Sequence, residues 1–411
     1  MNLLPARTAV AVFLAFAFTY FFATLLRAIT ATLAPTLTQE FSLHSRDLGL
    51  LAGGYFLGFS AIQLPLGSWL DRHGPRRVIL AFLGIAVAGC IAFSQATSFA
   101  SLLAARVLCG VGLGATLMAP LTGFRRWLGP AAQLRANSWM LMTGSFGMLA
   151  STLPVQWLMP VLGWRPLFWG LAALIAVSMV VLALTVPAWQ RAATADPAGQ
   201  PGSYAQVWRD RYFRRMAPIG FFCYGGMIAI QTLWAGPWLV RVAGDAPLQA
   251  AAGLFTINSC MLAAFLGWGT LMPRLARRGL TANRLIACGL PSSLVVLAMI
   301  IVSGPAAGAW SWALFCVSST FVSLAQPSVG MAFPPALAGR ALSGYNLVIF
   351  SGVFVVQWGI GLLIDGFAGV GLGTVDSFRA ALAVFLACSA ASYGYFMLAN
   401  RDNRRIATAI P

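Results

Sequence analysis

LFWGLAALIAVSMVVLAL, residues 167–184, is an unbroken apolar run whose only polar side chain is Ser178. A helix needs about 20 mostly apolar residues to cross a bilayer, so the run is long enough to do so. A membrane-spanning strand would instead alternate apolar and polar residues over about 10 positions. The run therefore predicts a transmembrane helix.

Similar apolar stretches recur along the whole chain of 411 residues, which is 59% hydrophobic and only 9% charged. This composition is too apolar for a soluble globular protein. The stretches that we expect to span the membrane are residues 8–34, 48–70, 77–97, 99–122, 136–160, 165–187, 214–240, 248–271, 281–303, 307–332, 341–366 and 377–399. The sequence thus predicts an all-α membrane protein with twelve transmembrane helices.

The net charge of +17 comes from arginine, because all 26 basic residues are arginine. Twenty of them fall in the two tails and in the connections that would lie on one side of the membrane, and four fall on the other side. Cytoplasmic segments carry such an excess. The charge therefore predicts cytoplasmic N- and C-termini in a multi-pass inner-membrane protein, and nucleic acid is not an expected partner.

The longest polar stretch, around residues 191–213, predicts a cytoplasmic linker between two halves, 1–190 and 214–411. The halves resemble each other at offsets of 202 to 205 residues. The residues that match are Pro35 with Pro237, Gly67 with Gly269, Arg72 with Arg274, Arg76 with Arg278, and Gly147 with Gly352. This indicates two six-helix bundles related by a parallel repeat, an arrangement in which substrate binds near the middle of the membrane.

GSWLDRHGPRR, residues 67–77, lies in the loop that we expect after the second span. It contains one acid among arginines, at a spacing that does not help to orient the chain, and we expect Asp71 to cap and charge-pair at neighbouring helix ends. The pattern resembles the signature of the major facilitator superfamily, and RVLCGVG, residues 106–112, resembles a second motif of that family. The resemblance implies a bacterial secondary transporter with twelve helices in two bundles that works by alternating access. It also implies a conformational latch formed by Gly67, Asp71, Arg72, Gly74, Arg76 and Arg77.

Arg27 interrupts FFATLLRAITATLAP, residues 21–35, where a guanidinium costs roughly 3 kcal/mol or more. All nine acids fall in expected loops, tails or last helical turns. Two readings remain: a structural arginine bonded to carbonyls or water, or an arginine whose partner is the cargo. The segment resembles helix 1 of the superfamily's organophosphate and organic-anion branches, which implies that Arg27 binds an anion. A second arginine is missing at the matching position, Ala229, so a monoanion such as a carboxylate is favoured over a phosphate.

Other polar and aromatic residues interrupt the apolar stretches and are candidate substrate contacts, although packing between helices explains such residues equally well. Two interpretations of Arg106 stay open: its guanidinium bonds to oxygens of neighbouring helices, or it faces the substrate cavity. The remaining candidates are Tyr20, Thr30, Tyr55, Tyr224, Gln231, Asn258, Gln326, Tyr345 and Asn346.

These features predict a secondary transporter for a small organic anion, coupled to protons or to exchange of a second anion. The alternative is proton-coupled efflux of drug-like or hydrophobic compounds, which would ordinarily use a membrane-embedded carboxylate. An enzyme is not expected, because the two histidines lie at predicted membrane edges and no nucleophile and base share a recognisable spacing. The seven cysteines lack metal-ligand spacing. We expect no metal, no cofactor and a monomer whose partners are its small-molecule substrate, protons and the lipid bilayer.

Overall fold

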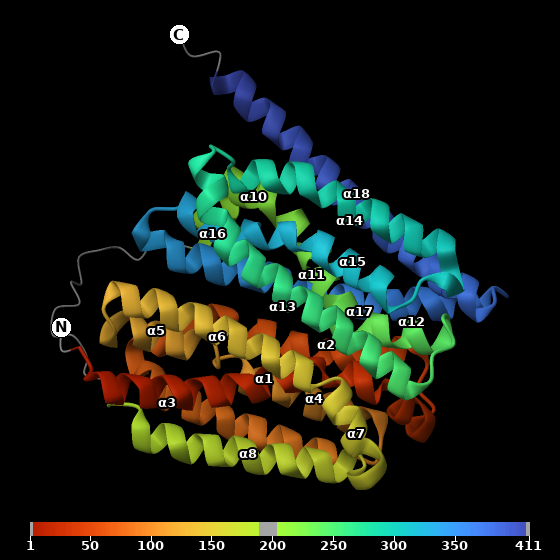
Figure 1. Cartoon of the computed structure of the whole chain (residues 1–411), viewed down its shortest axis with the longest axis horizontal. Helices are drawn as coiled ribbons and strands as arrows, with labels where there is room; N and C mark the ends of the chain where they lie inside the picture. The colour runs from red at the N-terminus through yellow and green to blue at the C-terminus, as the bar shows by residue number, and fades with distance from the viewer. Residues whose placement is uncertain (1–2, 189–203, 408–411) are drawn as a thin grey trace. The chain divides into compact units, whose positions relative to one another are not determined.

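The computed structural model describes residues 3–188 and 204–407, and within these ranges the chain is helical without any β-strand (Figure 1). The helices before residue 189 are α1 (Ala6–Phe41), α2 (Ser45–Ala61), α3 (Gln63–Ser94), α4 (Phe99–Leu113), α5 (Met118–Trp127), α6 (Pro130–Ala150), α7 (Leu153–Leu162) and α8 (Trp164–Thr185). The apolar run 167–184 thus forms most of α8.

The helices after residue 203 include short π- and 3₁₀-helical segments, labelled η. They are α9 (Tyr204–Arg209), α10 (Arg211–Pro218), η1 (Ile219–Tyr224), α11 (Gly225–Ala229), η2 (Ile230–Trp234), α12 (Ala235–Arg241), α13 (Pro247–Arg277), α14 (Ala282–Ser303), η3 (Gly304–Ala306), α15 (Ala309–Ser319), η4 (Thr320–Leu324), α16 (Ala325–Ala332), α17 (Pro335–Gly369) and α18 (Thr374–Ala407). The all-α prediction is confirmed.

Ten helical spans in the described ranges are long and apolar enough to cross a membrane, and the number is eleven if the bent pair α6 and α7 counts as one span. The sequence predicted twelve. The difference arises at α2, which has only 17 residues, and at α3, which joins the end of the second expected stretch to most of the third. All twelve expected stretches nevertheless fall on helices.

The signature stretch 67–77, predicted to be a loop, is almost entirely helical. It lies inside α3, and only Gly74 has non-helical backbone angles, with φ 78° and ψ 161°. Glycine adopts this left-handed φ without steric cost. Pro75 can begin the next helical turn because a first-turn residue needs no amide donor. A single glycine therefore makes the break that the sequence analysis assigned to a loop.

The fifth expected span, 136–160, is broken where α6 meets α7 with a bend of 44°. Pro154 lacks an amide proton, so it cannot donate to the carbonyl four residues earlier in a regular helix. At the break, Thr32 of α1 donates from Oγ1 to the Ser151 carbonyl at 2.8 Å. A side chain from a neighbouring helix thus satisfies a backbone carbonyl that the apolar interior would leave without a partner.

The chain divides into two compact units, Met1–Ser42 with Leu51–Gln200, and Leu43–Leu50 with Pro201–Pro411. The main division falls inside the expected linker 191–213. Residues 191–203 lie outside the described residues, whereas the rest of that linker is largely helical, in α9 and the start of α10. The expected bundle limits, 1–190 and 214–411, remain a proposal.

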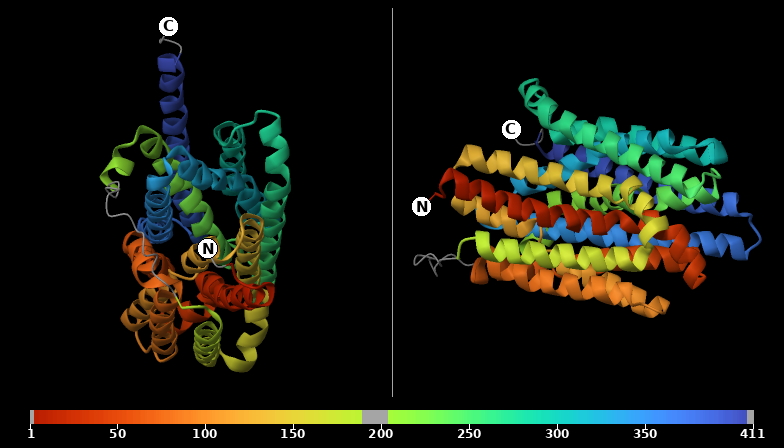
Figure 2. Two further views of the ribbon diagram at one scale, coloured as in Figure 1. Left: turned by 90° about the vertical axis from the view of Figure 1, so that its left-hand side faces the viewer. Right: turned by 60° about the horizontal axis from the view of Figure 1, so that its bottom comes forward.

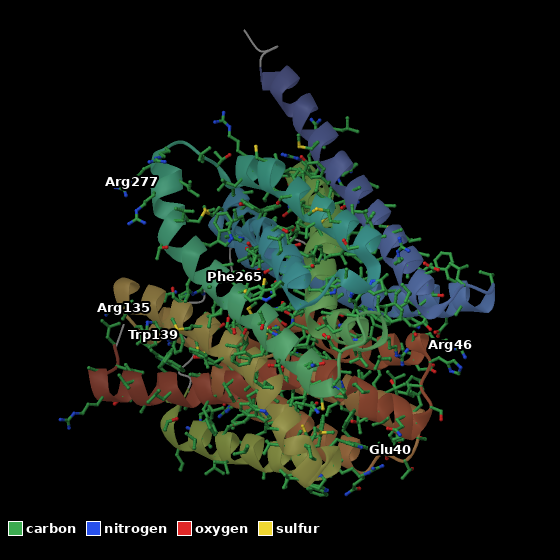
Figure 3. All side chains as sticks on the ribbon, turned by 45° about the vertical axis from the view of Figure 1, so that its right-hand side comes forward. Glu40, Arg46, Arg135, Trp139, Phe265 and Arg277 are labelled. Atoms are coloured by element: carbon green, nitrogen blue, oxygen red, sulfur yellow. The ribbon has the colours of Figure 1, made fainter. Side chains whose placement is uncertain are left out.

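In the first unit, α1 packs against both α6 and α8, while α3 packs against α4 and α8 (Figure 2). Residues of α1 are largely buried along its length from Val12 to Leu37. At its end, Glu40, which is labelled in Figure 3, accepts hydrogen bonds from Trp164 Nε1 at 2.7 Å and from Arg165 Nη1 at 2.6 Å. This polar contact fixes the end of α1 against the start of α8.

In the second unit, α17 packs against η1, α11, α16 and α18. The segment Leu43–Leu50 belongs to this unit, and Asp365 of α17 accepts hydrogen bonds from the backbone amides of Ser45 at 3.1 Å and Arg46 at 2.8 Å. A carboxylate at a helix N-terminus satisfies amides that have no partner within the helix. Asp365 thus caps the start of α2.

Candidate functional site

Arg27 lies in the middle of α1, on the same face of the helix as Tyr20 and Thr24. The spacings of seven and three residues place the three side chains along one stripe, because an α-helix has 3.6 residues per turn. Tyr20 and Thr24 are buried, whereas Arg27 is partly buried. The helix therefore presents two hydroxyls and one guanidinium in a row.

Three aromatic residues surround the guanidinium. The Arg27 Cζ atom lies 5.3 Å from the centre of the Phe59 ring, within the range of a cation–π interaction. The hydroxyls of Tyr20 and Tyr55 lie near enough to the Arg27 guanidinium to interact with it electrostatically, and the Tyr55 hydroxyl donates to the Ala23 carbonyl at 3.5 Å. The Tyr55 and Phe59 rings are themselves stacked, with centres 6.3 Å apart. The site thus combines hydrogen-bond donors with aromatic faces in an apolar helix bundle.

Arg106 of α4 lies behind this site and is fully buried. Its Nη1 donates to the Leu26 carbonyl at 3.0 Å, and its Cζ lies 5.2 Å from the centre of the Tyr55 ring. Arg106 therefore contacts the backbone next to Arg27 and a side chain beside Arg27. Of the two readings that the sequence left open, this geometry favours the bond to a neighbouring helix.

Glycines bring α2 and α4 close enough for these contacts. A Cβ atom at Gly110 would overlap the Tyr55 carbonyl oxygen and lie 2.7 Å from the Tyr55 carbonyl carbon. A Cβ atom at Gly58 of α2 would similarly overlap the Val107 carbonyl oxygen of α4. Small residues permit this backbone approach in membrane bundles. Two glycines therefore set where Tyr55 lies.

Thr30, another candidate in α1, is buried three residues beyond Arg27.

Phe59 was not among the sequence candidates. A phenylalanine in an apolar stretch looks like any packing residue, so its place beside Arg27 could be found only from the fold. A weak signal was available, since Tyr55 was a candidate and Phe59 follows it by one helical turn.

In the second unit, the candidate amides form two pairs. Gln231 Nε2 donates to Asn258 Oδ1 at 3.0 Å, joining η2 to α13. Gln326 Nε2 donates to Asn346 Oδ1 at 2.5 Å, joining α16 to α17. Both pairs fit the packing interpretation, in which amides hydrogen-bond between helices.

The two tyrosine candidates of this unit differ in their environment. Tyr345 is fully buried and donates from its hydroxyl to the Met216 carbonyl at 3.1 Å. Tyr224 is partly buried at the end of η1. Tyr224 and Gln231 thus both lie in π-helical turns, which occur frequently at functional sites.

Gln357 of α17, which was not among the sequence candidates, is fully buried. Its Nε2 donates to Thr232 Oγ1 at 3.0 Å, and its backbone carbonyl accepts from Trp234 Nε1 at 3.0 Å. The sequence did hold a signal for this residue, because a glutamine interrupts the apolar stretch 341–366. Gln357 ties η2 to α17 beside the candidate Gln231.

The family model of the Major Facilitator Superfamily matches residues 16–357. The chain belongs to this superfamily. Sequence relatives include a probable sulfoacetate transporter from Cupriavidus necator, 27% identical over 347 residues that cover 78% of each chain. A 3-(3-hydroxy-phenyl)propionate transporter from Escherichia coli is 27% identical over 359 residues, covering 81% of this chain and 86% of that protein.

Solved structures give the same fold. A bacterial homologue of the human lysosomal transporter Spinster matches with a TM-score of 0.73 and 17% sequence identity, covering 97% of this chain and 98% of that one. The match of the family model confirms the superfamily resemblance seen in the signature residues. Membership identifies the chain as a multi-pass membrane transporter rather than an enzyme.

The signature residues of this superfamily member lie around the break in α3. Asp71 and Arg72 are exposed, and Asp71 has no hydrogen bond or ion pair to any described residue. Arg76 donates from Nη2 to the Ala183 carbonyl at the end of α8. A Cβ atom at Gly67 would meet no described atom within 4 Å. The expected capping and charge pairing of Asp71 therefore stays a prediction.

Proposed function

We propose that this chain carries a small organic anion, presenting one carboxylate or sulfonate group, across the inner membrane by alternating access. The observation that supports this most is the convergence of the Arg27 guanidinium with the hydroxyls of Tyr20 and Tyr55 inside the first unit. A guanidinium offers donors only, in a planar fork that suits two oxygens of an anion. The Tyr20 hydroxyl can add a third donor, and the Tyr55 hydroxyl, which donates to the Ala23 carbonyl at 3.5 Å, can add a fourth if it turns from that carbonyl to the anion.

The number of charges at the site supports an anionic group of low charge. Arg106 is turned toward the Leu26 carbonyl and the Tyr55 ring, so we assign it to support of Arg27 rather than to the cargo. Ala229 stands at the repeat position of Arg27. One guanidinium matches the charge of one carboxylate or sulfonate better than that of a doubly charged phosphate.

The 3-(3-hydroxyphenyl)propionate relative agrees with this assignment, because that acid carries one carboxylate. The sulfoacetate relative shares the organic-anion class, although sulfoacetate carries both a carboxylate and a sulfonate. The aromatic faces of Phe59 and Tyr55 would suit the apolar part of such acids. We further propose cytoplasmic N- and C-termini, a monomeric carrier, and coupling to protons or to exchange of a second anion.

Ligand binding and counterflow test this proposal. The purified protein is screened by thermal shift against sulfoacetate, 3-(3-hydroxyphenyl)propionate and benzoate, with glycerol 3-phosphate and the cation tetraphenylphosphonium as comparators. At 100 times its Kd, a ligand that binds only the folded state stabilises it by about 2.7 kcal/mol. We expect stabilisation by at least one of the three organic acids and none by the cation.

Counterflow in proteoliposomes then separates transport from binding. Vesicles loaded with the acid that binds best should take up its labelled form, and the uptake should change with a pH gradient or with an anion on the opposite side. Stabilisation by the cation alone would contradict an anion carrier and favour the drug-efflux alternative. Uptake indifferent to both a pH gradient and a trans anion would exclude both coupling schemes.

For the signature residues, we propose that Asp71 acts as a latch during the transport cycle. Replacing Asp71 by asparagine should lower transport turnover several-fold while ligand affinity stays within about threefold of the parent. The reason is that the substitution removes a charge next to the α3 break at Gly74 and leaves the residues around Arg27 unchanged. Counterflow rates are measured at matched protein density, with Asp245→Asn as the control acid outside the signature. Equal rates for parent and Asp71→Asn would contradict the latch.

A further inference from the structure

Gly144 of α6 lies against the Tyr20 side chain of α1. A Cβ atom at Gly144 would lie 2.6 Å from Tyr20 Cε1 and 3.1 Å from Tyr20 Cζ, with Thr24 Cγ2 at 3.3 Å. The first of these distances is shorter than a carbon–carbon contact allows. The ring of Tyr20 therefore occupies the space that any side chain at position 144 would fill.

The position of the ring determines the position of its hydroxyl. Tyr20 is buried, lies two turns before Arg27 on the same face of α1, and its hydroxyl is near enough to the Arg27 guanidinium to interact with it electrostatically. A phenol is rigid beyond two side-chain torsions, so a displacement of the ring also displaces the hydroxyl. Gly144 thus affects a donor beside the guanidinium without contributing a side chain itself.

We propose that Gly144 is a specificity-determining position of the anion site. Its lack of a side chain lets Tyr20 lie against α6 with the hydroxyl beside Arg27, as a second donor to the bound carboxylate or sulfonate. This inference rests on the proposed function and adds which side chain shares the anion with Arg27 and what positions that side chain. Hydrogen bonds to charged acceptors are stronger than neutral ones, so losing this donor weakens binding measurably.

Gly147, one turn further along α6, lies against backbone rather than against Tyr20. A Cβ atom there would overlap Thr24 Oγ1 and the Phe21 carbonyl oxygen and lie 3.1 Å from the Phe21 carbonyl carbon. An alanine at 147 must therefore push two helix backbones apart, whereas an alanine at 144 needs only to move a ring. In α8, a Cβ atom at Gly170 would meet no described atom within 4 Å. The chain thus offers two matched glycine-to-alanine controls.

The test measures dissociation constants of sulfoacetate, 3-(3-hydroxyphenyl)propionate and benzoate by isothermal titration calorimetry. For each acid that the parent binds, Tyr20→Phe should weaken binding about tenfold. Gly144→Ala should weaken it about three- to tenfold and change the ratio of the affinities, at a melting temperature near that of the parent. The double variant should bind no more weakly than Tyr20→Phe, because moving a ring that lacks the hydroxyl removes no donor.

The controls separate positioning from packing. Gly170→Ala should leave both melting temperature and affinity unchanged. Gly147→Ala should lower the melting temperature, while the protein that remains folded keeps the parent's ratio of affinities for the acids. If Gly144→Ala behaves like Gly147→Ala, with lower stability and an unchanged ratio, Gly144 serves packing alone and the inference is wrong.

Failure of this inference is distinguishable from failure of the proposed function. If the parent binds none of the three acids, the proposed function is wrong and the inference falls with it. If the parent binds and either Tyr20→Phe or Gly144→Ala binds as the parent does, only the inference is wrong. If Gly144→Ala does not fold, Tyr20→Leu/Gly144→Ala should fold because leucine vacates the ring position. If that double variant also fails to fold, then contact with Tyr20 is not the reason that position 144 must be glycine.

Discussion

Replacing Arg27 by alanine is expected to weaken binding of the organic anion by about 30- to 1,000-fold, or roughly 2 to 4 kcal/mol. This is the cost of removing one member of a desolvated charge pair. The hydroxyls of Tyr20 and Tyr55 would remain as donors, but without a positive charge beside them. Arg27→Lys should recover only part of the affinity, because an ammonium keeps the charge and loses the planar fork.

The alanine variant should still fold. A guanidinium inside a membrane helix costs roughly 3 kcal/mol or more, so its removal lowers the cost of insertion. Thermal shift and titration calorimetry with the three organic acids measure stability and affinity in the same samples. Arg7→Ala is the matched control, because Arg7 lies exposed in the first turn of the same helix. A structural Arg27 would give the reverse pattern, with poor folding and near-parental affinity in the protein that survives.

Much of the fold follows from the sequence, because an apolar run as long as 167–184 has one stable form in a membrane. Arg27 could be selected for a similar reason, since a charge in such a run is costly and needs an explanation. The sequence could not place Phe59 beside Arg27 or pair Gln231 with Asn258, because both facts depend on which helices are neighbours.

Two local features of the fold could not be predicted from hydrophobicity. Polar residues in GSWLDRHGPRR suggested a loop, yet the bundle keeps this stretch helical up to one glycine with a left-handed φ. The bend between α6 and α7 occurs within a stretch whose hydrophobicity is continuous. Hydrophobicity sets where a helix can lie in the membrane, whereas single glycines, prolines and hydroxyl partners from other helices decide where it bends or ends.

Replacing Gly110 by alanine is expected to destabilise the first unit by about 1 to 3 kcal/mol, as overpacking of a close-packed interior does. The added methyl group would overlap the Tyr55 carbonyl and lie 3.0 Å from the Tyr55 Cα atom, so no side-chain rotation relieves the contact. Helices α2 and α4 must separate instead, and Tyr55 then moves away from Arg27. Anion affinity should therefore fall together with the melting temperature.

Gly170→Ala is again the control, since a methyl group at that position meets open space among the described residues and removes the entropic cost of a helical glycine. The two substitutions add the same group to helices of the same unit, so any difference between them reports the local packing. Gly110→Leu should leave no folded protein, because a larger side chain requires a larger separation of two backbones. A Gly110→Ala variant that melts and binds like the parent would show that the close approach of α2 and α4 is wrong, and with it the position of Tyr55 beside the guanidinium.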